Sequence, residues 1–178
     1  MSKMHSLLAA VLLLPASGLL ANDAKVRTTA HLEIKKLRGP GAAEHARALY
    51  GSQTKWRPVS RAIETGQGDW LQVAVLLNGY ADGSFSEELN TAMALALLNH
   101  PANVLRAIRT AEGPGAFSIG RVCAAPIPTP GKAWLKRYKA QAIRALRGVS
   151  SIQLRPLRDG CLKTLHGVDT SLPSNAYD

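Results

Sequence analysis

The chain has 178 residues, with 22 Lys and Arg against 12 Asp and Glu, and a formal net charge of +10. This length is enough for one domain with a hydrophobic core, and the charge favours solubility and attraction to anions without selecting a fold. The longest apolar run is shorter than the roughly 20 residues of a membrane-spanning helix, so the composition argues against a transmembrane segment.

The N-terminal residues have the layout of a secretory signal peptide. Lys3 supplies a positive charge, residues 7–14 form an apolar core, and small residues follow. Ala21 is the expected last residue before cleavage, so residues 1–21 would be removed. We therefore expect the mature protein to be periplasmic or secreted.

The predicted mature chain is one helical domain at residues 22–166, followed by a polar, flexible tail at 167–178. The stretch 22–40 has two interpretations. Alternation of apolar with polar residues indicates a half-exposed strand at Ala30, Leu32 and Ile34. No partner strand is evident, however, and Leu37 also permits a helix, so both interpretations stay open.

Apolar residues spaced three or four apart, with turn residues between the segments, predict helices along the rest of the chain. The expected helices cover residues 42–50, 58–65, 70–79, 84–98, 101–110, 132–148 and 159–165. Asp69 is expected to cap the helix that begins at Trp70. We predict an all-α fold, a compact antiparallel stack of about six helices with one disulfide. Because no internal period is convincing, a repeat solenoid is not favoured.

The two cysteines of the chain are Cys123 and Cys161. Exactly two cysteines in an oxidising compartment favour an intramolecular disulfide. A zinc site normally needs three or four ligands, and no histidine lies near either cysteine in sequence. We expect a structural disulfide that closes a loop of about 39 residues, with no metal and no cofactor.

The C-terminal third carries a surplus of positive charge, because residues 113–158 contain no Asp or Glu. On a helical wheel of residues 132–148 the apolar side chains share one face. The opposite face carries Lys132, Lys136, Lys139 and Arg147, flanked by Arg137 and Arg144. This face is predicted to bind an acidic protein or an anionic envelope component. Alternatively, it is an ordinary solvated face whose acids come from other helices, such as Glu87 and Glu88.

Signals for catalysis, metal binding and nucleic-acid binding are weak. The histidines at 31, 45, 100 and 166 are scattered, without the spacing that places two ligands on one helical face. No catalytic residue is predicted, although a deep pocket joining Glu64, Asp69, Asp82 or a histidine would support an enzyme. Nucleic acid is not the expected partner, because export removes the usual target and the basic face lacks interleaved aromatics.

Short motifs between residues 64 and 165 combine helix-packing residues with the two cysteines. They are Asp69-Trp70-Leu71, Val73-Ala74, Ser86-Glu87-Glu88-Leu89, Ala94-Leu95-Ala96-Leu97, Pro101, Val104-Leu105, Val122-Cys123, Pro126 and Cys161-Leu162. This combination resembles small exported bacterial helical proteins of unknown function. The resemblance implies helix packing and a disulfide, carries over no active-site residue, and leaves residues 22–60 without a counterpart.

Three functions follow from these features. The first is a periplasmic protein-binding module of inhibitor or immunity type, which acts by surface recognition. The second is a basic envelope adaptor that binds anionic lipid or wall polymer, with binding that falls steeply with salt. The third is an enzyme whose site assembles from residues far apart in sequence.

Overall fold

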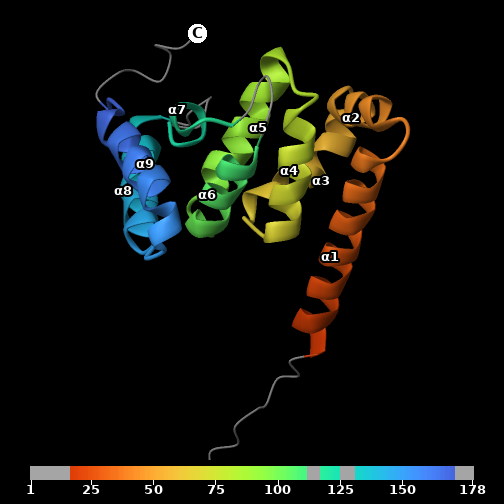
Figure 1. Cartoon of the computed structure of the whole chain (residues 1–178), viewed down its shortest axis with the longest axis horizontal. Coiled ribbons are helices and arrows are strands. Elements are labelled where there is room, and N and C mark those ends of the chain that lie inside the picture. The colour runs from red at the N-terminus through yellow and green to blue at the C-terminus, as the bar shows by residue number, and fades with distance from the viewer. Residues whose placement is uncertain (1–16, 112–116, 125–130, 171–178) are drawn as a thin grey trace, which may run out of the picture.

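The computed structural model describes residues 17–111, 117–124 and 131–170, with side chains from residue 28 onward (Figure 1). These ranges contain helices and no strand, which confirms the predicted all-α class. The helices are α1 (Ser17–Arg38), α2 (Ala42–Tyr50), α3 (Gln53–Glu64), α4 (Gly68–Asn78), α5 (Gly83–Ala96), α6 (Pro101–Thr110), α7 (Ile119–Val122), α8 (Lys132–Arg147) and α9 (Arg155–Gly167), with a 3-10 turn at Ile152–Leu154. Helix α7 is additional to those predicted, and α1 includes the stretch for which both a strand and a helix were left open.

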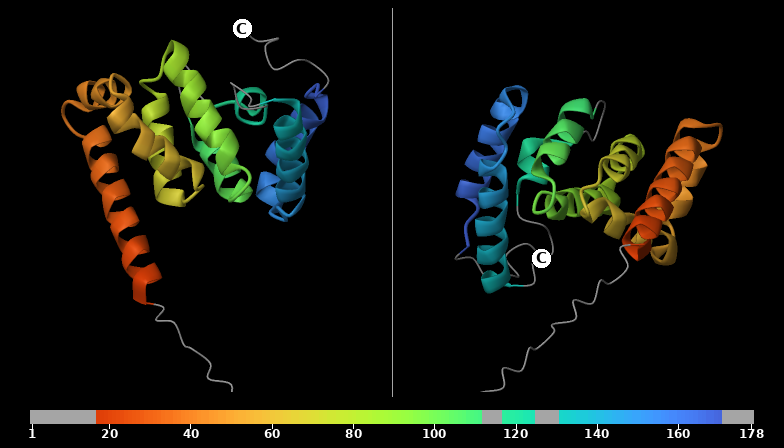
Figure 2. Two further views of the ribbon diagram at one scale, coloured as in Figure 1. Left: turned by 180° about the vertical axis from the view of Figure 1, so that it is seen from behind. Right: turned by 90° about the horizontal axis from the view of Figure 1, so that it is seen from below.

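The helices pack as two layers. Helices α1, α4, α6 and α8 contact one another in series as one layer, and α3, α5, α7 and α9 form the second. Successive helices cross between the layers as hairpins, with α2 linking α1 to α3. The hairpins therefore follow one another across the molecule, from α1 at one end to α8 and α9 at the other (Figures 1 and 2). This is the predicted antiparallel stack.

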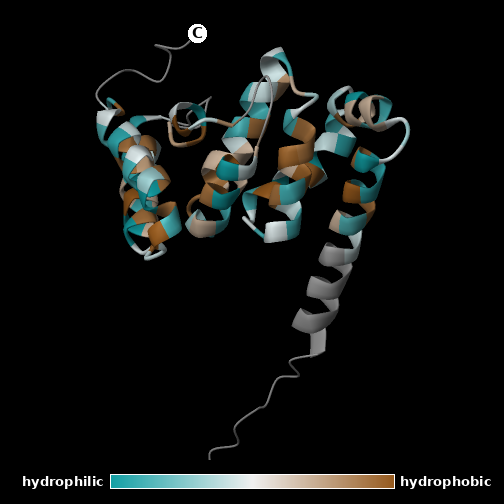
Figure 3. Ribbon diagram, viewed as in Figure 1, coloured by the Kyte–Doolittle hydropathy of each residue, from teal (hydrophilic) through white to brown (hydrophobic). Residues whose placement is uncertain are grey.

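Apolar side chains from both layers meet between them and form the core. Helix α4 is apolar almost all round (Figure 3), and its Val73, Ala74 and Leu77 are fully buried. Helix α5 buries Leu89 and Met93 on the face predicted from their spacing. Burial of a large side chain such as Leu77, Leu89 or Met93 stabilises the fold by roughly 1.5–3 kcal/mol, so the α4–α5 hairpin contributes strongly to the core.

Residues 28–38 belong to helix α1, and the strand interpretation of this stretch is wrong. Ala30, Ile34 and Leu37 are at most 8% exposed, whereas Leu32 is 54% exposed. Their spacing of four and three residues is that of one helical face. The apolar surface of α4, against which α1 packs, selects this period over the alternation that includes Leu32.

Helices α3 and α4 begin earlier than predicted, and α9 includes the predicted segment 159–165 and extends beyond both of its ends. Helix α3 starts at Gln53 and includes Pro58, and the extra turn buries Trp56 to 3% exposure. Helix α4 starts at Gly68 after Gln67, so Asp69 is not the cap but a first-turn residue, where its charge suits the positive end of the helix. Helix α9 starts at Arg155, because Pro156 is suited to the first turn.

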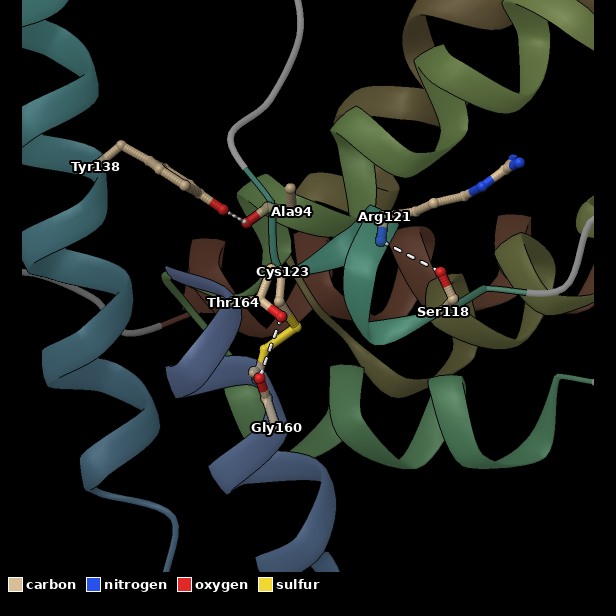
Figure 4. The surroundings of a disulfide bond; sticks show 8 residues. Ala94, Ser118, Arg121, Cys123, Tyr138, Gly160 and Thr164 are labelled. Atoms are coloured by element: carbon tan, nitrogen blue, oxygen red, sulfur yellow. Dashed lines mark hydrogen bonds between the residues drawn. A yellow bond between two sulfur atoms is a disulfide. The ribbon is translucent and has the colours of Figure 1, made fainter. Parts of the chain in front are cut away.

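The predicted disulfide between Cys123 and Cys161 is confirmed, and it joins the end of α7 to α9 (Figure 4). Both cysteines are fully buried, and the apolar residues Phe117 and Val122 are buried in the same segment. A Cβ at Gly160 would lie 2.9 Å from Ile119 Cδ1. A glycine beside the disulfide therefore lets α7 lie directly against α9. Residues 112–116 and 125–130, on either side of this segment, lie outside the described ranges.

The predicted signal peptide and most of the tail also fall outside the described side chains. Within α1, the described buried residues begin at Ala30. Cleavage after Ala21 would therefore leave every described buried residue of α1 in the protein. Helix α9 ends at Gly167, and residues 171–178 are not described. In the described part of the chain, none of the helices combines the length and the apolar character required to cross a membrane.

Candidate functional site: the basic face of α8

Helix α8 separates its apolar and basic side chains as predicted. Leu135, Tyr138, Ala142 and Leu146 are buried, and Tyr138 Oη donates a 3.1 Å hydrogen bond to the Ala94 carbonyl of α5 (Figure 4). Burial also raises the pKa of the Tyr138 phenol. We name the exposed cations of this helix the basic α8 face: Lys132, Lys136, Arg137, Arg144 and Arg147.

Lys139, which was predicted with these outer cations, instead binds within the fold. Its Nζ donates hydrogen bonds to the carbonyls of His166 at 3.1 Å and Val168 at 2.8 Å. These carbonyls lie at the C-terminal end of α9, where a positive charge is favourable. Lys139 therefore holds α9 against α8, and its role depends on a neighbouring helix that the wheel of α8 does not include.

The basic α8 face has no carboxylate partner among the described residues. The ion pairs that Lys and Arg form among the described residues lie on other helices. They join Lys36 to Glu33, Arg47 to Glu44 and Arg158 to Asp159. Glu87 and Glu88 of α5 are exposed and pair with none of the α8 cations. The alternative in which these acids neutralise the face therefore finds no support, and the cations repel one another.

Two hollows lie beside α6, on the layer that contains α4 and α8. The first runs between α4 and α6 and has a volume of about 390 Å³, with Arg38 at its edge. The second lies between the start of α6 and the end of α8 and has about 360 Å³. Asn103 and Arg106 line both hollows. No sequence pattern points to these hollows, because they form between helices that are not consecutive.

The hollows do not assemble the side chains expected of an enzyme. Glu64, Asp69 and Asp82 line neither hollow. His100 lines the second, together with asparagines and serines but no described carboxylate. Across the described residues, no cluster of three His, Cys, Asp or Glu side chains is placed to hold a metal ion.

One charged cluster that the sequence analysis missed has a structural role. Glu33 of α1 is 9% exposed, and its carboxylate binds His45 Nε2 at 2.6 Å and Lys36 Nζ at 2.9 Å. Burial acts to raise the pKa of Glu33, but the hydrogen bonds and positive charges of Lys36 and His45 outweigh it and lower the pKa. Because His45 lies on α2, the cluster fixes the α1–α2 corner.

Comparison with protein-family models, curated proteins and solved structures gave no match for this chain. The resemblance to small exported bacterial proteins stays a prediction. The geometry itself singles out the basic α8 face, because cations without described partners are concentrated on one exposed surface.

Proposed function

We propose that the protein is an exported binding protein that recognises an acidic partner protein through the basic α8 face. The observation that carries the proposal is the set of exposed cations on one helix that pair with no described carboxylate. An external anionic surface would relieve their mutual repulsion and speed association. The exported location is supported by the signal-like N-terminus and by the buried disulfide, which is typical of oxidising compartments.

The composition of the basic α8 face favours a protein partner over a membrane. Between its cations the helix exposes only Ala133, Ala140 and Gln141. Trp134 is half-buried and stacks on Tyr138 with ring centroids 5.3 Å apart. Helices that insert into a lipid surface present large apolar side chains to it, and the exposed face of α8 has none.

The test is capture of the partner from envelope extract by the disulfide-bonded protein, with a matched pair of charge-reversal variants. One variant replaces Lys136, Arg137, Arg144 and Arg147 by Glu. The control makes the same change at exposed cations on α1 and α3: Lys35, Lys55, Arg57 and Arg61. Circular dichroism would check that both variants keep the helical content of the wild type.

We expect the wild type and the control to retain one stoichiometric protein at moderate salt, and the α8 variant to lose it. A carbodiimide that joins amines to carboxylates without a spacer should link Lys132 or Lys136 to an Asp or Glu of that protein. Equal capture by the α8 variant would remove this face from the proposal. Recovery of only lipid or wall polymer, and only at low salt, would favour the envelope adaptor instead.

A further inference from the structure

We propose that the hollow between α4 and α6, hereafter the α4/α6 groove, binds an extended acidic segment of the partner protein. This inference rests on the proposed function and names a second contact for the same partner. The segment would alternate acidic and apolar side chains and would continue from the groove toward the basic α8 face.

The lining of the groove combines apolar and cationic groups. Leu71, Val75, Leu76 and Ala107 form an apolar surface, and the exposed side chains of Arg38 and Arg106 flank it. No described residue that lines either hollow is acidic. A segment that alternates carboxylates with apolar side chains would bury its apolar groups on α4 and direct its charges to the two arginines.

Arg106 is positioned to accept a carboxylate. Its Nη1 donates a 2.7 Å hydrogen bond to Asn103 Oδ1, which orients the guanidinium and leaves most of its five N–H donors for a ligand. Arg38 takes part in no ion pair within the described ranges. Gln72 is exposed in the same groove and has no described hydrogen bond, so its amide is suited to bind a peptide backbone.

The end of the groove beside α6 is fixed by polar contacts to the turn before α4. Asn103 Nδ2 donates to the Gly66 carbonyl at 3.1 Å, and Asn99 Nδ2 donates to the Glu64 carbonyl at 3.1 Å. A Cβ at Gly66 would lie only 2.8 Å from the Cβ of His100. The spacing of α4 and α6 is therefore set before any ligand binds, which lowers the entropic cost of association.

The two hollows set the length and direction of the bound segment. The second hollow is lined by Ala145 of α8 and by Gly148 directly after it, each adjacent in sequence to an arginine of the basic α8 face. The path from α4 across α6 to α8 covers two interhelical spacings, or about 20 Å. An extended chain spans this distance with about six residues, so a single short segment can contact both Arg106 and the edge of the basic α8 face.

The test measures binding of a defined probe, a capped and fluorescein-labelled peptide of alternating Glu and Leu, about six residues long. Fluorescence anisotropy with the disulfide-bonded protein would give the affinity. Arg106→Ala should weaken binding about tenfold, the effect of losing a charge-assisted hydrogen bond. Arg109→Ala is the matched control, because Arg109 is exposed on the same helix but does not line the groove.

A second variant tests the groove by blocking it. A Cβ at Gly68 would meet no atom within 4 Å, so Gly68→Trp should fold while its indole occupies the groove that Gly68 lines. We expect it to abolish binding of the Glu-Leu peptide, and we expect a Lys-Leu peptide not to bind the wild type. Binding that is unchanged in both Arg106→Ala and Gly68→Trp would overturn the inference.

The two proposals fail in different experiments. If the α8 charge reversal abolishes partner capture but Arg106→Ala and Gly68→Trp do not, the groove inference is wrong and the proposed function stands. If the wild type captures no protein but the Glu-Leu peptide binds in an Arg106-dependent way, the groove binds acidic peptides and the proposed α8 recognition is wrong.

Discussion

Removal of the disulfide should destabilise the protein by about 4 kcal/mol. Cys123 and Cys161 are 38 residues apart in sequence, and the chain-entropy model assigns about 4 kcal/mol to a cross-link that closes a loop of this length. For the roughly 157 residues that cleavage after Ala21 would leave, the unfolding entropy converts this loss into a fall of the melting temperature by about 12 °C. The small cavities that Cys123→Ala and Cys161→Ala leave in the buried site would add to it.

The assay compares thermal unfolding, followed by circular dichroism, for the oxidised wild type, the reduced wild type and the double alanine variant. Reductant should lower the melting temperature of the wild type and leave that of the variant unchanged. Because the bridge joins α7 to α9 and lies far along the stack from α1, hydrogen exchange should accelerate first in α7, α8 and α9. A decrease in melting temperature of less than about 3 °C, or equal acceleration of hydrogen exchange in α1 and α9, would refute this reasoning.

Two further substitutions, one of them with a control variant, address the groove end and the α1–α2 corner. Gly66→Ala should lower the unfolding free energy by about 2 kcal/mol, because Gly66 has φ of +74° and its new Cβ would meet His100. In the control variant Gly68→Ala the new Cβ would meet no atom within 4 Å, so urea unfolding should show unchanged or slightly higher stability. The folded-state pKa of Glu33 is lowered, so its stabilisation is present above the unfolded pKa and is lost as the pH falls through the folded value. Glu33→Gln should therefore be less stable than the wild type at neutral pH and lose less stability below about pH 4; parallel pH profiles would contradict the assignment.

The parts of the fold that local sequence signals determine were predicted from the sequence. Helices α4, α5, α6 and α8 each carry an apolar stripe at helical spacing, and glycine or proline marks most of the turns between them. The disulfide was predicted from the presence of two cysteines in a chain whose N-terminus resembles an export signal. The helix predictions need only residues that are close in sequence, and the disulfide prediction needs only the number of cysteines.

The parts that depend on distant residues were not predictable in the same way. Ala30 and Ile34 fit a strand pattern with Leu32 and a helix pattern with Leu37, and contact with α4 decides between the two. Pro58 suggested a helix start, but burial of Trp56 extends α3 beyond it. Lys139 lies among cations in sequence, and only the position of the α9 carbonyls assigns it to the fold.

The two-layer packing explains why α6 contributes to both the core and the candidate binding surface. Val104, Leu105 and Ile108 bury one side of α6, while Asn103 and Arg106 face the two hollows. Since the neighbours of α6 in its layer are α4 and α8, a ligand along its outer side would meet the apolar residues of α4 in one direction and the edge of the basic α8 face in the other. Charge alone would attract any polyanion, and apolar area alone would attract any hydrophobic segment. If the proposed segment binds here, its selectivity would come from requiring both apolar and cationic contacts within about 20 Å of each other.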